Sequence, residues 1–369
     1  MVAFLIITSV LLFILAAVLL ILSQQDSLAK ADRQMESYSV PDWVLDQDYG
    51  RVSDQPEASL DQVDQSRNEI DPQASELVAD STVATMERSA IAVEEANADT
   101  SQTLLTIEDM PDSDSYDECY EEANLHYLRG DYQKAIRHYS RAIQLKPELA
   151  SSYNNRGNAL YNLGYYQTAI ADYSQALQID SGSSKFHYNR ANAYNALDEA
   201  SEALADYTKA IQLNPNYAEA YNNRGTVVHA LGQQKDALSD YSKAIEIFPE
   251  YAEAYSNRGS VFYCLKKYTQ AIADYDQALA FDPNDAEAYN NRGNAYYDQQ
   301  SYEDALADYE QAIQINESYS EAYYNRGLVY RKLSQAENAV LDFNRALELA
   351  QQQGNFSLLA KLQKMIQPT

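Results

Sequence analysis

From Tyr116 onward the chain repeats itself every 34 residues, and this period restricts the possible fold more than any other feature of the sequence. The clearest copy reads AEAYNNRG at residues 218–225, and nearly the same block recurs at 252–259 and 286–293. The seven copies begin at 116, 150, 184, 218, 252, 286 and 320, with no insertion between them. A fixed period of this length predicts one structural unit that stacks on its own copies.

Each copy has the pattern of two helices. In the fourth copy the apolar residues have helical spacing over 219–231 and again over 235–247, with Gly232 at the turn between them. Pro249 follows the second segment, and proline does not continue a helix and disfavours helical backbone in the residue before it. Three other copies have a proline at the same place, namely Pro147, Pro215 and Pro283. Each unit is therefore predicted to be a helical hairpin.

Small residues at fixed places indicate how the hairpins stack. Alanine occupies two positions seven residues apart in every second helix, for example Ala237 and Ala244, and an aromatic ring such as Tyr241 lies between them. The first helix has glycine at the position of Gly225 in five copies and alanine in the other two. Because glycine costs about 1 kcal/mol inside a helix, its recurrence indicates a close contact between helices.

This combination resembles the tetratricopeptide repeat, which has a 34-residue period, an aromatic residue and glycine in the first helix, and alanine, a ring and alanine in the second. The resemblance covers residues 116–353. It implies an all-α fold, a right-handed α-solenoid of seven helix-turn-helix repeats whose first helices line a concave groove. Arginine stands where the family usually has leucine before the glycine. The repeats would span 116–149, 150–183, 184–217, 218–251, 252–285, 286–319 and 320–353, and a capping helix in 354–369 would close the array.

The N-terminal segment has the character of a membrane span. Residues 2–22 carry no charge and only two polar side chains. A helix of that length measures roughly 31 Å, enough for a hydrocarbon core of roughly 30 Å. We predict a single-pass transmembrane helix over 1–22 that serves as an uncleaved signal anchor; a signal peptide cleaved near residues 27–29 is the alternative. Lys30 and Arg33 follow the segment and favour the cytoplasmic side for the repeats by the positive-inside rule.

The stretch 23–115 holds 22 acidic residues against five basic ones and has no periodicity. Low hydrophobicity and high net charge leave too little apolar surface to offset chain entropy, so we predict a disordered linker. An apolar island at 40–45 around Trp43 is either a linear docking motif or an incidental patch. Over the whole chain, 55 acidic and 27 basic residues give a net charge of −28, which argues against general binding to the phosphates of nucleic acids.

Two charged positions recur together in six of the seven copies. Arginine precedes the glycine of the first helix and aspartate precedes the ring of the second, whereas the first copy has Glu122 and His138 instead. We interpret this joint presence and absence as a bidentate Arg–carboxylate bridge that fixes helix stacking, in preference to a ligand site. This structural ladder would consist of Arg156, Arg190, Arg224, Arg258, Arg292 and Arg326 with Asp172, Asp206, Asp240, Asp274, Asp308 and Asp342.

Asparagines form a second series on the first helix, and helical propensity does not explain their recurrence. An amide offers a donor and an acceptor, so it can bond to an extended peptide backbone whatever its side chains are. The alternative is that the amides satisfy local groups or were copied by duplication, and the sequence leaves both open. The candidate peptide-binding residues are Asn155, Asn189, Asn223, Asn257, Asn291 and Asn325, followed by Asn158, Asn192 and Asn294; Asn154, Asn222 and Asn290 are expected beside them.

The sequence has no Walker loop, GxSxG elbow, HExxH motif or EF-hand loop, and its four histidines lie at unrelated repeat positions. We therefore expect no enzymatic activity, no cofactor and no metal site. The expected function is a membrane-tethered protein–protein interaction scaffold or assembly factor that binds an extended polypeptide in the concave groove. Two alternatives are a self-associating structural protein and a regulatory adaptor that recruits an enzyme through the linker. The partner's identity and the oligomeric state stay open.

Overall fold

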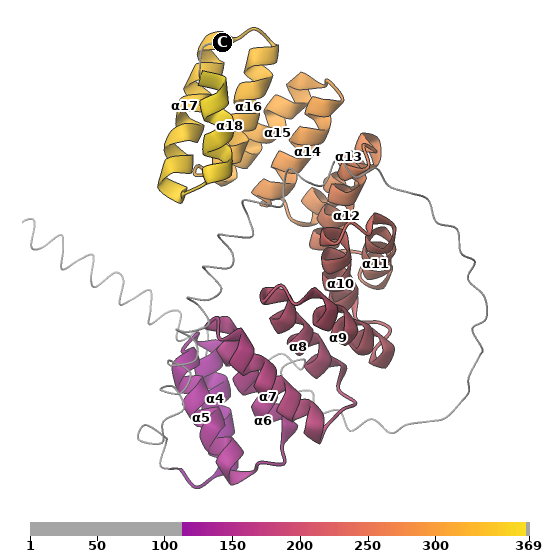
Figure 1. Cartoon of the computed structure of the whole chain (residues 1–369), viewed down its shortest axis with the longest axis vertical. Coiled ribbons are helices and arrows are strands. Elements are labelled where there is room, and N and C mark those ends of the chain that lie inside the picture. Colours follow the sequence, from indigo (N-terminus) through magenta and orange to yellow (C-terminus); the bar gives the residue numbers. More distant parts are fainter. Residues whose placement is uncertain (1–112, 367–369) are drawn as a thin grey trace, which may run out of the picture. The chain divides into compact units, whose positions relative to one another are not determined.

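The structure is a computed structural model that describes residues 113–366, and these form fifteen α-helices, α4 to α18, with no strand among them (Figure 1). All of them belong to one compact unit, which falls within Ser75–Thr369. The transmembrane helix predicted for 1–22, and the linker up to residue 112, lie outside the described residues. Within the described range, no helix is both long and apolar enough to cross a bilayer.

Seven helical hairpins follow one another, and each packs against the next in chain order. The first helices are α4 (Tyr116–Leu128), α6 (Ala150–Asn162), α8 (Ser184–Ala196), α10 (Ala218–Ala230), α12 (Ala252–Cys264), α14 (Ala286–Asp298) and α16 (Ser320–Lys332). The second helices are α5 (Tyr132–Leu145), α7 (Tyr166–Ile179), α9 (Ala200–Leu213), α11 (Gln234–Ile247), α13 (Tyr268–Phe281), α15 (Tyr302–Ile315) and α17 (Ala336–Gln353). The all-α repeat architecture is therefore confirmed, with helix ends within one residue of those predicted for the fourth copy.

The ring between the two alanines forms the core of each hairpin. Tyr241 is 1% exposed and lies between Ala237 and Ala244, which are fully buried. A Cβ atom on Gly225 would stand 2.9 Å from Tyr241 Cε1, closer than carbon atoms approach in folded proteins. The recurring glycine of the first helix therefore makes room for the ring of the second. The same ring is at most 1% exposed in six hairpins, at Tyr139, Tyr173, Tyr207, Tyr241, Tyr275 and Tyr309.

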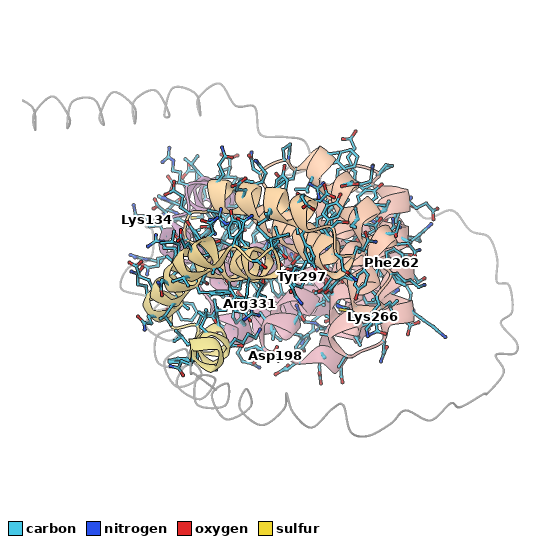
Figure 2. The ribbon with its side chains drawn as sticks, turned by 90° about the horizontal axis from the view of Figure 1, so that it is seen from above. Lys134, Asp198, Phe262, Lys266, Tyr297 and Arg331 are labelled. Atoms are coloured by element: carbon cyan, nitrogen blue, oxygen red, sulfur yellow. The ribbon has the colours of Figure 1, made fainter. Side chains whose placement is uncertain are left out.

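The turn inside each hairpin requires a left-handed residue. Glycine supplies it in three hairpins, with φ between 76° and 82° at Gly130, Gly164 and Gly232. Asp198, Lys266, Gln300 and Ser334 adopt the same conformation in the others, with φ between 58° and 64°. Figure 2 marks Asp198 and Lys266 at two of these turns.

The two ends of the described array are closed differently. At the N-terminal end, the Ser115 side chain accepts a hydrogen bond from the Glu118 backbone N–H and caps α4. At the other end, α17 stops at Gly354, whose φ of 67° is left-handed, and α18 (Phe356–Ile366) follows. Leu358 and Leu362 of α18 are buried in one cluster with residues of α16 and α17. The eleven-residue helix thus covers apolar surface of the seventh hairpin.

Candidate functional site

The ladder arginines each meet the aspartate of their own hairpin. Arg258 donates from Nε to Asp274 Oδ2 at 2.8 Å and from Nη2 to Asp274 Oδ1 at 2.7 Å. These bonds raise the pKa of Arg258 above its ordinary value, and the aspartate is only 7% exposed. Five further pairs have the same bidentate geometry at 2.6–2.9 Å: Arg156 with Asp172, Arg190 with Asp206, Arg224 with Asp240, Arg292 with Asp308 and Arg326 with Asp342.

Most ladder arginines also reach the preceding hairpin. Arg258 Nη1 donates to Ser242 Oγ at 3.1 Å, and Arg292 Nη1 donates to Asp276 Oδ1 at 2.6 Å. Equivalent bonds join Arg156 to Ser140, Arg190 to Ser174 and Arg224 to Thr208. One guanidinium on a first helix therefore holds its own second helix and the second helix before it, which fixes the stacking register of two hairpins.

The first hairpin carries an inverted pair instead of the Arg–Asp bridge. Glu122 lies on α4 and His138 on α5, with His138 Nδ1 at 3.1 Å from Glu122 Oε2. Burial lowers the pKa of His138, so the imidazole is mainly neutral at neutral pH. At this position of the repeat, a permanent charge pair is thus confined to the six hairpins that stack on a preceding one.

Five of the six asparagines in the first series bond to the hairpin before them. Asn189 Nδ2 donates to Asn154 Oδ1 at 2.8 Å, and Asn257 Nδ2 donates to Asn222 Oδ1 at 3.0 Å. Asn155 and Asn223 donate to the hydroxyls of Tyr120 and Tyr188, and Asn325 donates to Asn290. Asn291 is the exception. The residue 35 positions before it is Ser256, and no hydrogen bond joins these two described residues. These amides link consecutive first helices to one another.

Three asparagines expected beside this series occupy a different place. Asn154, Asn222 and Asn290 are only 2%, 0% and 5% exposed, so they do not line an open face. Each accepts a hydrogen bond from the next first helix and is enclosed by the stacking of hairpins. A buried amide without a partner is costly, so the asparagine of the following hairpin satisfies it.

The second series of asparagines meets the buried tyrosine of its own hairpin. Tyr173 OH donates to Asn158 Oδ1 at 2.9 Å, Tyr207 OH to Asn192 Oδ1 at 2.6 Å, and Tyr309 OH to Asn294 Oδ1 at 2.8 Å. The same place is filled by Asn124 for Tyr139, Thr226 for Tyr241 and Ser260 for Tyr275. Each polar residue here therefore satisfies a phenol that would otherwise be buried without a partner.

Sequence reasoning missed this pairing, although the repeats contain the signal. In the seventh hairpin the ring is Phe343, which has no hydroxyl, and the residue at the acceptor position is Leu328. The six hairpins with tyrosine all have asparagine, threonine or serine at that position. Comparison of these two positions across the copies predicts the contact, because loss of the donor accompanies loss of the acceptor.

A recess of about 240 Å³ opens on the first three hairpins, lined by Tyr127, Asn158, Tyr161, Asn162, Tyr173, Asn189 and Asn192. Although Asn158 Oδ1 and Asn189 Nδ2 make the bonds described above, Asn158 Nδ2 and Asn189 Oδ1 have no partner among the described residues. None of the lining residues is charged. The recess therefore presents free amide donors, on Asn158 Nδ2 and Asn192 Nδ2, and free amide acceptors, on Asn162 Oδ1 and Asn189 Oδ1. Together they can bond the C=O and the N–H of a peptide group.

Comparison with known families identifies the repeat. The family described as TPR repeat matches residues 123–164, 157–198, 192–232, 227–266, 259–300 and 293–334, and the tetratricopeptide repeat matches 320–353. The chain belongs to the tetratricopeptide repeat family. A comparison with curated proteins gives no match.

Solved tetratricopeptide repeat structures share the fold. A tetratricopeptide repeat protein from Parabacteroides merdae ATCC 43184 has a TM-score of 0.55 at 25% identity, over 68% of this chain and 99% of that one. The APC/C hetero-tetramer Cut9–Hcn1 has a TM-score of 0.55 at 19% identity, over 66% and 46%. The pilF protein of Pseudomonas aeruginosa has a TM-score of 0.52 at 19% identity, over 59% and 98%. The last two comparisons concern the fold alone.

Tetratricopeptide repeat proteins bind protein or peptide partners, and the repeats and their solved neighbours support a role for this chain as a protein–protein interaction scaffold. The amides, hydroxyls and aromatic rings of the described residues can contact a polypeptide partner. Among residues 113–366 no group of three or more histidines, cysteines or carboxylates is placed to hold a metal ion.

Proposed function

We propose that this protein holds an extended segment of a partner polypeptide against its first helices, with the recess of the first three hairpins as a fixed point of contact. The observation that carries this proposal is a pair of free amide groups there, Asn158 Nδ2 and Asn189 Oδ1. A peptide group has one C=O acceptor and one N–H donor. Asn158 Nδ2 can donate to the first and Asn189 Oδ1 can accept from the second, whatever the side chains of the peptide are. In this proposal the chain catalyses no reaction and needs no cofactor.

The series asparagines take part in both stacking and binding under this proposal. Asn189 uses one N–H to bond Asn154, and its carbonyl oxygen stays available. Asn158 uses its carbonyl oxygen for Tyr173, and its two N–H donors stay available. Stacking thus orients each amide, and a rigid, pre-oriented group loses less entropy when a ligand binds.

Asn158→Thr is expected to weaken partner capture and leave the fold intact. Threonine already accepts the phenol bond in the fourth hairpin, where Thr226 pairs with Tyr241, so stability should change by less than about 0.5 kcal/mol. Loss of the free amide donors should lower partner affinity by about five- to tenfold. The full chain in detergent would capture partners from an extract of its own cells, and quantitative mass spectrometry would compare the variant with wild type.

The same exchange outside the recess serves as a matched control. Asn294→Thr replaces the equivalent residue of the sixth hairpin, which accepts from Tyr309 and from Asn325 and does not line the recess. It should leave partner capture unchanged. Equal capture by wild type, Asn158→Thr and Asn294→Thr would show that the recess does not hold the partner.

We further propose that residues 2–22 tether the repeats to a membrane, with the repeats on the cytoplasmic side. Support comes from the uncharged segment and from Lys30 and Arg33 after it. The described cysteines provide the test, because Cys264 is exposed and Cys119 is buried. A membrane-impermeant maleimide should label the chain only after cells are permeabilised, and Cys264→Ser should abolish that signal. Labelling of intact cells would place the repeats outside, and recovery of the chain without membranes would contradict the tether.

A further inference from the structure

Four of the six loops between consecutive hairpins share one local hydrogen bond. After a second helix ends, an aspartate or asparagine side chain accepts a hydrogen bond from the backbone N–H two residues on. The pairs are Asp180 with Gly182 at 2.9 Å, Asn214 with Asn216 at 3.1 Å, Asp282 with Asn284 at 3.0 Å and Asn316 with Ser318 at 3.0 Å. The first hairpin has Lys146 at this position and the fourth has Phe248, and neither side chain can accept that bond.

Phe248 does not compensate for the missing turn bond by packing into the core. Its side chain is 48% exposed, and its ring lies 5.7 Å from the ring of Tyr251. The next hairpin exposes a second phenylalanine at the end of its second helix, since Phe281 is 41% exposed and lies 5.9 Å from Tyr255. Phe248, Tyr251, Tyr255 and Phe281, here called the aromatic edge, belong to the same border of two successive hairpins. A large exposed ring that also removes a turn bond indicates a surface with a binding role.

The charges around the aromatic edge are almost all negative. At the same ends of the helices of these hairpins lie Glu219, Glu246, Glu250, Glu253, Asp282, Asp285 and Glu287. The lysine nearest them in sequence, Lys243, bonds to Glu246 at 2.8 Å, and Arg258 is held by Asp274. Lys266 and Lys267 follow the far end of α12, a helix of about 20 Å.

The helix ends add to this negative potential. Both α11 and α13 end at this border with no basic residue in their last turn. Free carbonyl groups at a helix C-terminus carry partial negative charge and attract cations. Within this protein a guanidinium already lies over a tyrosine ring, as Arg258 does over Tyr255 at 5.6 Å.

We propose that the aromatic edge, centred on Phe248, binds an arginine-bearing segment of a partner protein. A guanidinium stacks on the exposed ring and meets the surrounding carboxylates, which combines a cation–π contact with ion pairing. A second copy of this chain is a poor occupant, because its net charge is −28. This surface lies on the fourth and fifth hairpins and does not share a residue with the recess of the first three.

The decisive variant is Phe248→Asn, which introduces the residue type that accepts the loop hydrogen bond in the third and sixth hairpins. The asparagine should accept from the Glu250 backbone N–H, so the melting temperature should stay the same or rise slightly. The probe is a fluorescein-labelled glycine–serine peptide that carries arginines, titrated with the full chain in detergent and followed by fluorescence polarisation. Wild type should bind it, and Phe248→Asn should bind about fivefold more weakly or worse.

Two control peptides separate stacking from charge alone. Citrulline in place of arginine keeps the planar shape and loses the charge, so it should not bind measurably. Lysine in place of arginine keeps the charge and should bind more weakly than arginine. Equal affinity of wild type and Phe248→Asn for the arginine peptide, or equal binding of the citrulline peptide, would overturn the proposal.

Two further measurements distinguish peptide binding at the aromatic edge from binding in the recess and from self-association of the chain. Asn158→Thr should bind the arginine peptide as wild type does, whatever it does to partner capture. Sedimentation of wild type and Phe248→Asn should give the same mass. If wild type forms a dimer that Phe248→Asn dissociates, the occupant is a second copy and the proposal is wrong.

Discussion

Replacing Arg258 with leucine is expected to lower the free energy of unfolding by about 3 kcal/mol, a large effect for a single residue in one repeat. The variant leaves the Asp274 carboxylate 7% exposed and without either of its guanidinium bonds. It also removes the bond to Ser242 that joins the fourth hairpin to the fifth. A buried charge whose partner is deleted costs more than the pair contributed, because its desolvation is no longer offset.

Hydrogen exchange is the suitable measurement, since repeats in a linear array open separately. Protection should fall in the fourth and fifth hairpins and stay close to wild type in the first. The control is Arg258→Leu with Asp274→Leu, which removes both charges and should be less damaging than the single change. If Arg258→Leu keeps full thermal stability and loses partner binding, the ladder serves a ligand and not the stacking.

Replacing Tyr241 with alanine is expected to destabilise the fourth hairpin by about 4 kcal/mol. The ring is 1% exposed and fills the space that Gly225 leaves open, so its removal creates a cavity between two helices. Neighbouring backbone cannot collapse into it, because Ala237 and Ala244 already bring the helices together. Thermal and urea unfolding followed by circular dichroism would measure the loss.

A second variant at this position distinguishes the contribution of the ring to stability from that of its hydroxyl. Tyr241→Phe keeps the ring and leaves Thr226 without the 3.2 Å bond, so the loss should be only about 1 kcal/mol. Adding Thr226→Val should recover part of it, as the seventh hairpin pairs Phe343 with Leu328. Equal losses for Tyr241→Ala and Tyr241→Phe would show that the hydroxyl and not the ring stabilises the hairpin.

Alkaline unfolding tests the contribution of the same phenol. Burial raises the pKa of Tyr241 to about 12, against about 10 for an exposed tyrosine. The neutral phenol therefore favours the folded state, and its contribution is complete below about pH 10 and lost as the pH rises through about 12. In Tyr241→Phe this part of the alkaline destabilisation should be absent.

Much of the fold followed from patterns that repeat at the same place in each copy. The hairpin, its turn, the glycine under the ring and the Arg–Asp partners all join residues within one 34-residue unit. Such contacts can be predicted from the sequence because the same two positions can be compared in seven copies. A donor that is present only when its acceptor is present indicates a hydrogen bond between them. The bond from the buried tyrosine to its polar acceptor could be predicted from the sequence in the same way, because Phe343 and Leu328 lack the donor and the acceptor together.

Contacts between consecutive hairpins could not be predicted from the sequence in this way. Asn189 and Asn154 are 35 residues apart, and their contact depends on how one hairpin is rotated on the next. An asparagine offers donor and acceptor to either side, so its presence alone does not tell whether it faces a neighbour or a ligand. Exposure of Phe248 likewise follows from the position of the loop at the border of the stack.

The sequence by itself determined that this protein is a series of seven helical hairpins, because a 34-residue period, helical spacing and invariant small residues allow no other regular packing. Only the tertiary structure decided which amides are consumed in stacking, which remain free in the recess, and where an aromatic ring stays exposed. The physical reason is that those outcomes depend on the angle and offset between hairpins. That geometry is the sum of many side-chain contacts, and no single position in the repeat encodes it.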